Sequence, residues 1–166
     1  LTSEKSEIKE GTVNLEYQIP NIRITGTLIP THVPISWFRA VYNTQNPFAV
    51  ESFIDEMAYA AGKDPYLFRK EILPSDSRLL NVMNVAAEKS GWGKKLPEGR
   101  GMGIAISEGY ESFCAQVAEV TVTGSRLKID RYTAVIDCGV VVNPDSVEAQ
   151  LEGAIGFALS AALKGA

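Results

Sequence analysis

Apolar and polar residues in the first part of the chain follow the two-residue period of β-strands. From Thr12 to Ile19 every second position is apolar, and residues 22–28 show similar spacing after Pro20 breaks the first run. Prolines in Ile29–Ser36 remove backbone donors and restrict the chain, which is typical of an extended loop. The pattern therefore predicts a pair of half-buried strands followed by a loop.

Helical spacing replaces this pattern in the middle of the chain, where apolar residues recur at the period of a helix. Each run begins with a polar side chain that can accept a hydrogen bond from a first-turn N–H, and the first run ends at Gly62. We predict three helices, over residues 47–61, 65–72 and 79–90. Their start signals are Asn46-Pro47 with Asn46 as the N-cap, Asp64-Pro65, and Ser77 or Asp76.

The last third of the chain returns to strand patterns and finishes in one long helix. Residues 101–106, 114–122 and 127–137 have the composition of strands, and Thr123-Gly124-Ser125 suits a hairpin loop between the last two. Asn143-Pro144-Asp145 opens a helix over residues 145–163, and one face of this helix carries alanines and glycines. We expect that face to lie flat on the sheet.

This order of elements predicts an α+β fold, in which mixed or antiparallel sheet segments pack against helices. The polar connector Lys94–Gly99 is the expected boundary between two segments. Segment 1–98 would hold the strand pair and the helices, and segment 99–166 a strand, a hairpin and the final helix. A chain of 166 residues is long enough for one ordinary domain or for two small ones that share a core.

Composition argues against several classes of protein. The net charge of −4, without a basic stripe, disfavours a nucleic-acid partner. The apolar run Ala154–Leu163 is too short to span a bilayer, so no membrane span is expected. The chain begins without Met or a signal-type segment. We therefore expect an internal piece of a longer protein, with a processed mature protein as the alternative, and no cellular location follows.

Cysteine and histidine offer little for metal or nucleophilic chemistry. Cys114 and Cys138 are expected on buried strands as small apolar residues, and they lack zinc-site spacing. Whether they form a disulfide is left open, because the sequence gives no distance between them. His32 is the single histidine, which argues against a metal site or a Ser-His-Asp arrangement within this chain.

Arg39 is the leading candidate for ligand binding. It follows Trp37-Phe38 in a proline-bounded loop just before a helix N-terminus. A guanidinium there can hold a phosphate or a carboxylate with paired donors. The alternatives are an arginine stacked on Trp37 or paired with Glu51 at the surface.

The acidic residues and one glycine run have structural interpretations. Glu148 and Glu152 lie one helical turn apart, as on a solvated face, and Asp137 is placed to cap a turn, whereas the face of Glu119 is left open. Gly99-Arg100-Gly101-Met102-Gly103 looks like a phosphate-binding loop. It precedes a strand, whereas such a loop requires a following helix.

Two parts of the chain resemble a known family. The first has Ile19-Pro20-Asn21-Ile22-Arg23 followed by Trp37-Phe38-Arg39, and the second is Cys114–Ala166 with Asp137-Cys138-Gly139 and Asn143-Pro144-Asp145. In this order they resemble the molybdenum-cofactor-binding large subunits of the xanthine dehydrogenase and aldehyde oxidase family. The resemblance is strongest to the β-subunits of isoquinoline 1-oxidoreductases within that family.

The resemblance implies a fragment of the molybdopterin-binding domain of a molybdenum hydroxylase. Such enzymes oxidise aldehydes or hydroxylate N-heteroaromatic carbon with oxygen derived from water. The implied cofactor of the parent protein is molybdopterin, and the implied partner is a small iron–sulfur subunit. Arg39 matches an arginine of the molybdopterin pocket and Gln45 a glutamine near the same turn. Ala40-Val41-Tyr42-Asn43 departs from the Gly-aromatic-Gly-Gly run of xanthine-oxidase-type relatives.

The same resemblance implies an incomplete active site. The glutamate base of the family lies beyond the final helix, and other cofactor loops precede Leu1, so no catalytic residue or metal ligand is expected here and no turnover by the fragment alone. The alternative is a non-catalytic structural or interaction domain on the same α+β scaffold. A weaker alternative is a small stand-alone ligand-binding domain.

Overall fold

The structure is a computed structural model that describes residues 12, 15–25, 27, 30, 32–34 and 36–165. It contains helices and one antiparallel sheet, which confirms the α+β class. In chain order the elements are η2 (Val41–Asn43), α1 (Asn46–Ala60), α2 (Pro65–Ile72), α3 (Arg78–Ser90), β1 (Arg100–Gly109), β2 (Ser112–Thr123), β3 (Arg126–Asp137) and α4 (Pro144–Lys164).

Three of the four α-helices begin as the sequence indicates. The side chains of Asp64, Ser77 and Asn143 each accept a hydrogen bond from the backbone N–H three residues further on, at 3.0, 3.1 and 3.2 Å. These bonds satisfy N–H groups that the first turn of a helix leaves without a partner. The first helix differs: Asn46 lies inside α1, and Gln45 is the N-cap without a side-chain cap bond.

Asp64 also joins two helices. Its carboxylate accepts hydrogen bonds from the indole Nε1 of Trp92, at 3.1 and 3.0 Å. Trp92 follows the end of α3, which is terminated by Gly91 in the left-handed conformation with φ of 71°. One side chain therefore ties the start of α2 to the end of α3.

The sheet has the order β1-β2-β3, with each neighbouring pair antiparallel. β1 and β2 meet at Tyr110 and Glu111, both with positive φ, and Gly124 lies in the turn between β2 and β3. A bulge between Glu119 and Val120 shifts the register of β2 against β3. The three predicted strands are confirmed, and β1 is longer than expected.

The strand pair expected within residues 12–28 is not present in the described part of that range, where residues 15–25 and 27 form no strand. Instead the segment runs past the end of α2, and the backbone N–H of Gln18 donates to the carbonyl of Ile72 at 2.7 Å. Tyr17 is only 6% exposed, and Leu15 and Ile19 pack against the core. An extended segment with one side on a core has the same two-residue period as a strand, which explains the incorrect prediction.

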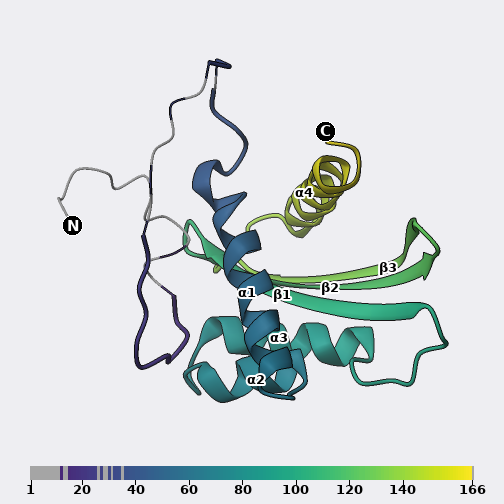
Figure 1. Cartoon of the computed structure of the whole chain (residues 1–166). Helices are drawn as coiled ribbons and strands as arrows, with labels where there is room; N and C mark the ends of the chain where they lie inside the picture. The colour runs from purple at the N-terminus through teal and green to yellow at the C-terminus, as the bar shows by residue number, and fades with distance from the viewer. Residues whose placement is uncertain are drawn as a thin grey trace.

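One hydrophobic core joins both expected segments. It includes side chains from α1, from α3 and from the inner face of the sheet, among them Ile54, Met83, Ala86, Ile104 and Val117. Figure 1 shows α2 and α3 on one side of the sheet and α4 on the other. The helices of the first segment therefore cover the strands of the second.

The final helix does not pack as predicted. No described residue of α4 is buried, and the helix stands away from the sheet instead of lying flat on it (Figure 1). The segment that leads into it turns at Gly139, with φ of 76°, and exposes Val140 and Val142 almost completely. Small side chains permit a close approach to a sheet, but they supply little apolar area to drive it.

Candidate functional site

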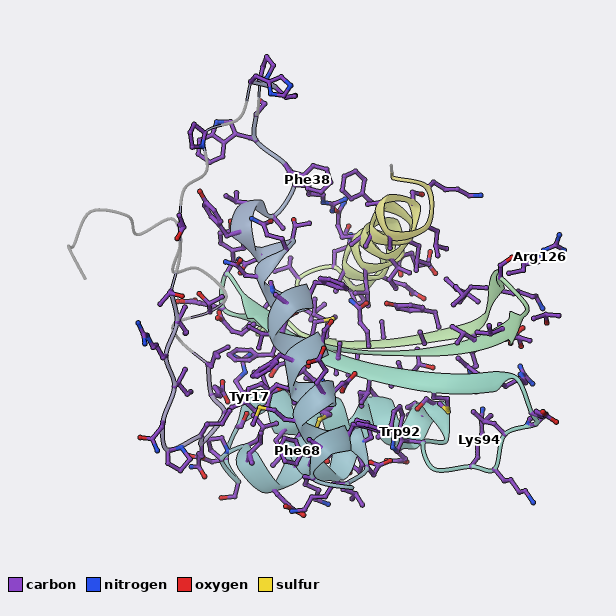
Figure 2. All side chains as sticks on the ribbon, in the orientation of Figure 1. Tyr17, Phe38, Phe68, Trp92, Lys94 and Arg126 are labelled. Atoms are coloured by element: carbon purple, nitrogen blue, oxygen red, sulfur yellow. The ribbon has the colours of Figure 1, made fainter. Side chains whose placement is uncertain are left out.

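A cleft of about 870 Å³ lies between α4, the turn before α1 and the neighbouring ends of the strands. Its walls are largely apolar, with several amide and hydroxyl side chains among them. Figure 2 shows Phe38, on the turn, directed toward α4. The lining residues include Phe38, Arg39, Asn43, Thr44, Gln45, Phe48, Ser107, Glu108, Cys114, Gln116, Leu151 and Phe157.

Arg39 projects from the turn into this cleft. Its Nη2 donates a hydrogen bond to Oε1 of Gln150 at 3.2 Å, and its guanidinium carbon lies 6.0 Å from the centre of the Phe157 ring. Phe38 contacts the same ring at a centroid distance of 5.3 Å. Arg39 is therefore held against α4 and not stacked on Trp37, whose exposure is 81%.

The turn that carries Arg39 has an unusual backbone. Ala40 and Val41 have φ of 67° and 51°, in the left-handed region that residues with a Cβ avoid. The hydroxyl of Thr44 donates to the carbonyl of Arg39 at 2.5 Å and bridges the turn. Strained backbone of this kind concentrates at ligand sites.

Gln45 lines the same cleft as Arg39. The structure thus brings together the two residues proposed from the resemblance. The side chain of Gln45 makes no capping hydrogen bond to α1. Gln150 and Phe157, which come from α4, were not predicted as part of the site. A glutamine and a phenylalanine among the small residues of that helix were the available signal.

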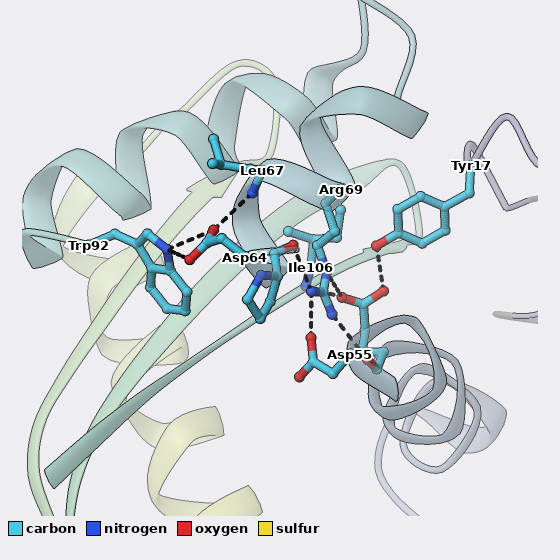
Figure 3. A network of polar contacts seen from close by, with 9 residues as sticks. Tyr17, Asp55, Asp64, Leu67, Arg69, Trp92 and Ile106 are labelled. Atoms are coloured by element: carbon cyan, nitrogen blue, oxygen red, sulfur yellow. Dashed lines mark hydrogen bonds and ion pairs between the residues drawn. The ribbon is translucent and has the colours of Figure 1, made fainter. Parts of the chain in front are cut away.

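A buried polar network fixes α1, and hence the turn before it, against the sheet. The carboxylate of Glu51 accepts hydrogen bonds from the Tyr17 hydroxyl at 2.7 Å, from Nε of Arg69 at 3.0 Å and from the backbone N–H of Ile106 at 2.9 Å. Arg69 has no exposed side-chain surface and also donates to Asp55 at 2.5 Å. Figure 3 shows Arg69 between Asp55 and Tyr17.

This network excludes the surface pair between Arg39 and Glu51 that the sequence left open. Burial beside the Glu51 carboxylate raises the pKa of the Tyr17 hydroxyl, so Tyr17 remains a hydrogen-bond donor. Because every charged member has a partner, the cluster positions α1 and offers no free acid or base. No pattern in the sequence indicated this cluster, since Glu51 and Arg69 lie on separate amphipathic helices.

Asp137 and the two glutamates of α4 also have structural rather than catalytic positions. Arg78 contacts both carboxylate oxygens of Asp137, at 2.8 and 2.6 Å, and the N–H of Gly139 donates to the same group at 3.1 Å. The Arg78 hydrogen bond, supported by Gly139, lowers the pKa of Asp137 to about 2. Asp137 thus caps a turn as expected, while Glu148 and Glu152 are exposed on α4.

Glu119 and the glycine run also lie in the scaffold. Glu119 faces the buried side of the sheet, where it pairs with Lys94 at 2.5 Å and with Arg100 at 3.0 Å. The hydrogen bond from Lys94 is the main cause of its lowered pKa. The run from Gly99 to Gly103 enters β1 and no helix, so it forms no phosphate-binding loop.

Cys114 and Cys138 are free thiols, each half-buried. Among the residues that the structure describes, no group of three or more His, Cys, Asp or Glu side chains is arranged to hold a metal ion. Within the same part of the chain, no helix combines the length and apolar character needed to cross a bilayer.

The chain belongs to the family of molybdopterin cofactor-binding domains. Residues 68–164 match one family model with this description, and residues 6–73 match a second with the same description. The two matches meet at residues 68–73, whereas the division at residue 98 expected from the connector stays a prediction.

The chain is also similar to three curated proteins. The chain is 32% identical over 152 residues to the beta subunit of isoquinoline 1-oxidoreductase from Brevundimonas diminuta, covering 89% of the chain and 20% of that protein. It is 33% identical over 178 residues to a nicotinate dehydrogenase subunit from Pseudomonas putida, covering 95% and 15%. The third, 34% identical over 148 residues, is "Membrane-bound aldehyde dehydrogenase [pyrroloquinoline-quinone]" of Gluconacetobacter polyoxogenes, covering 76% and 19%.

The chain therefore spans between 15% and 20% of the length of these relatives. No solved structure gives a significant match to it. The resemblance seen in the sequence is confirmed by the family and by these relatives.

The polar side chains of the cleft suit a molybdopterin, as far as this chain supplies them. A pterin presents nitrogen and oxygen atoms at its edge, and the attached phosphate is anionic. The cleft offers one guanidinium, from Arg39, and the side-chain amides of Asn43, Gln45 and Gln116. Glu108 is the acidic residue among its lining side chains in the described part of the chain, so an anionic group fits at the Arg39 end.

Proposed function

We propose that this chain forms one wall of the molybdopterin site in a molybdenum-dependent oxidoreductase of which it is a fragment. The parent enzyme would oxidise aldehydes or hydroxylate N-heteroaromatic carbon with oxygen derived from water. The observation that carries the proposal is the convergence of Arg39 and Gln45 in one cleft of a chain that belongs to the molybdopterin-binding family. Two relatives named for N-heteroaromatic substrates and one named for aldehydes support these substrate classes.

Arg39 binds the cofactor through paired N–H donors, while its neighbours hold the guanidinium in place. Gln150 accepts one of its hydrogen bonds and the Phe157 ring lies beside it. Because Thr44 fixes the carbonyl of Arg39, the side chain leaves the turn in a defined direction. Gln45 adds an amide that can donate to and accept from a pterin edge.

The remaining parts of the reaction belong to the rest of the parent protein. When bound, the cofactor supplies two-electron oxidation chemistry, and the general base that activates the attacking oxygen would come from outside this chain. Electrons would leave through a small iron–sulfur subunit. Two of the relatives are themselves named as subunits, which supports a multi-subunit parent. We expect no turnover by the fragment alone.

The test is Arg39→Ala in the protein that carries this chain, with Arg126→Ala as the control. Arg126 lies at the tip of the β2–β3 hairpin, away from the cleft (Figure 2). We expect Arg39→Ala to lower molybdenum content by about tenfold, measured by elemental analysis, with an unchanged circular dichroism spectrum. Arg126→Ala should keep both the metal and the turnover.

The same experiment distinguishes the proposed function from the alternative of a non-catalytic domain. A non-catalytic structural domain on this scaffold would carry no molybdenum in the wild-type protein. Unchanged metal content and unchanged turnover in Arg39→Ala would exclude a cofactor role for the arginine, even if the parent protein contains molybdenum.

A further inference from the structure

Three consecutive valines, Val140–Val142, lie on the surface between β3 and α4. Val140 is 92% exposed, Val142 is 94% exposed and Val141 is 46% exposed. The run follows the turn at Gly139 and directly precedes the N-cap of α4, Asn143. Consecutive apolar side chains in contact with water are rare on a complete protein surface and mark places where another segment binds.

The backbone of the valine run has no hydrogen-bond partner among the described residues. None of its three N–H groups finds an acceptor there, and none of its three carbonyls finds a donor. The flanking residues differ, because the N–H of Gly139 donates to Asp137 and the side chain of Asn143 caps α4. The run therefore combines exposed apolar side chains with free backbone donors and acceptors. β-Branched residues of this kind favour an extended backbone.

The helix that follows does not cover the run. No described residue of α4 is buried, and Figure 1 shows α4 standing away from the sheet. The chain covers between 15% and 20% of the length of its relatives, so a parent protein of that size has most of its residues outside this chain. Those residues are the available source of a cover for the valines.

We propose that Val140–Val142 is the docking site of an extended segment that belongs to the parent polypeptide outside residues 1–166. The inference rests on the proposed function, because it requires that this chain is a fragment of a larger subunit. An extended segment fits the run in two ways. Its backbone supplies the acceptors and donors that the valines lack, and its apolar side chains cover the valine side chains.

The first experiment measures the exposure of the valine side chains in the parent protein through a Val142→Cys variant. In the structure of this chain Val142 is almost fully exposed, so protection in the parent must come from outside the chain. We expect maleimide to label the new thiol at least about tenfold more slowly in the native parent than in urea. Mass spectrometry of the peptides separates this label from label on Cys114 and Cys138. Arg126→Cys, at the hairpin tip, is the control and should react at nearly its unfolded rate (Figure 2).

The second experiment tests the backbone pairing in the unaltered parent by amide hydrogen exchange. The amides of Val140–Val142 should exchange at least about a hundredfold more slowly in the native parent than in the unfolded protein, because pairing removes them from water. The amide of Gly124, in the turn between β2 and β3, should exchange within about tenfold of its unfolded rate.

Three results would overturn the proposal. The docking site is rejected if the Val142→Cys thiol reacts in the native parent as fast as in urea. An extended partner segment is excluded if the thiol is protected but the three amides exchange freely. Protection that disappears on dilution would assign the surface to a second copy of the protein.

Molybdenum analysis of the same preparations separates this inference from the proposed function. Parent protein that contains molybdenum but leaves the valines accessible refutes the docking site alone. Parent protein that protects the valines but never contains molybdenum refutes the proposed function and leaves the docking site standing.

Discussion

Replacing Arg69 by Met should destabilise the chain strongly. Arg69 is completely buried and is the only cation that the described structure places against the Glu51 carboxylate. Its removal leaves a buried negative charge that keeps only the hydrogen bonds from Tyr17 and from the Ile106 backbone. Breaking one side of a buried ion pair costs about 3–5 kcal/mol in the free energy of unfolding.

The companion variant is Glu51→Gln, alone and combined with Arg69→Met. Glutamine is nearly isosteric and keeps one oxygen for the Ile106 N–H, but it removes the charge that Arg69 opposes. Once both charges are absent, neither is left unpaired in the interior. The double variant should therefore lose about 1–3 kcal/mol less than the sum of the two single losses.

Urea unfolding of the 166-residue chain, followed by far-ultraviolet circular dichroism, measures these free energies. Lys63→Met is the matched control, because Lys63 pairs with Glu71 at the surface, where both side chains are about half exposed. That change should cost less than about 0.5 kcal/mol. A loss below about 1 kcal/mol for Arg69→Met, or strictly additive losses, would refute the network as the anchor of α1.

Two further predictions concern local contacts. Because Arg78 lowers the pKa of Asp137 from 3.8 to about 2, the folded state gains stability that is fully present above about pH 5 and is lost as the pH falls through about 2. In the Asp137→Asn variant, the free energy of unfolding should fall less steeply as the pH is lowered below about 5. An unchanged pH dependence would contradict the pairing of Asp137 with Arg78. Asp64→Ala removes both a helix cap and the acceptor of Trp92, so it should cost about 2 kcal/mol and alter tryptophan fluorescence, whereas Asn143→Ala, which removes a cap bond at the start of α4, should cost about 1 kcal/mol.

Local signals in the sequence were sufficient for most of the helices and strands. The capping side chains of Asp64, Ser77 and Asn143 act within three residues, so their positions mark helix starts without knowledge of the rest of the fold. The hairpin at Gly124 is equally local. The segment around Tyr17 was misjudged because burial against a core, and not pairing with a strand, produces its alternation.

The contacts of the candidate site, in contrast, could not be predicted from local signals in the sequence. Residue spacing left three interpretations of Arg39 open, and the family resemblance indicated which deserved pursuit. Its partner Gln150 is 111 positions away, and Arg69 is 18 positions from Glu51. Both pairings depend on how helices are placed in space. Charged residues on an amphipathic helix are usually solvated, so a sequence alone cannot separate a buried pair from a surface one.

The hydrogen bond from the Ile106 N–H to Glu51 makes the two edges of the sheet unequal. One of the backbone donors along the outer border of β1 is already taken by a side chain, and α1 lies across that border. β3 has no neighbouring strand on its far side within the described part of the chain. Lateral growth, whether by a partner's strand or during aggregation, is therefore expected to be one-sided and to start at β3.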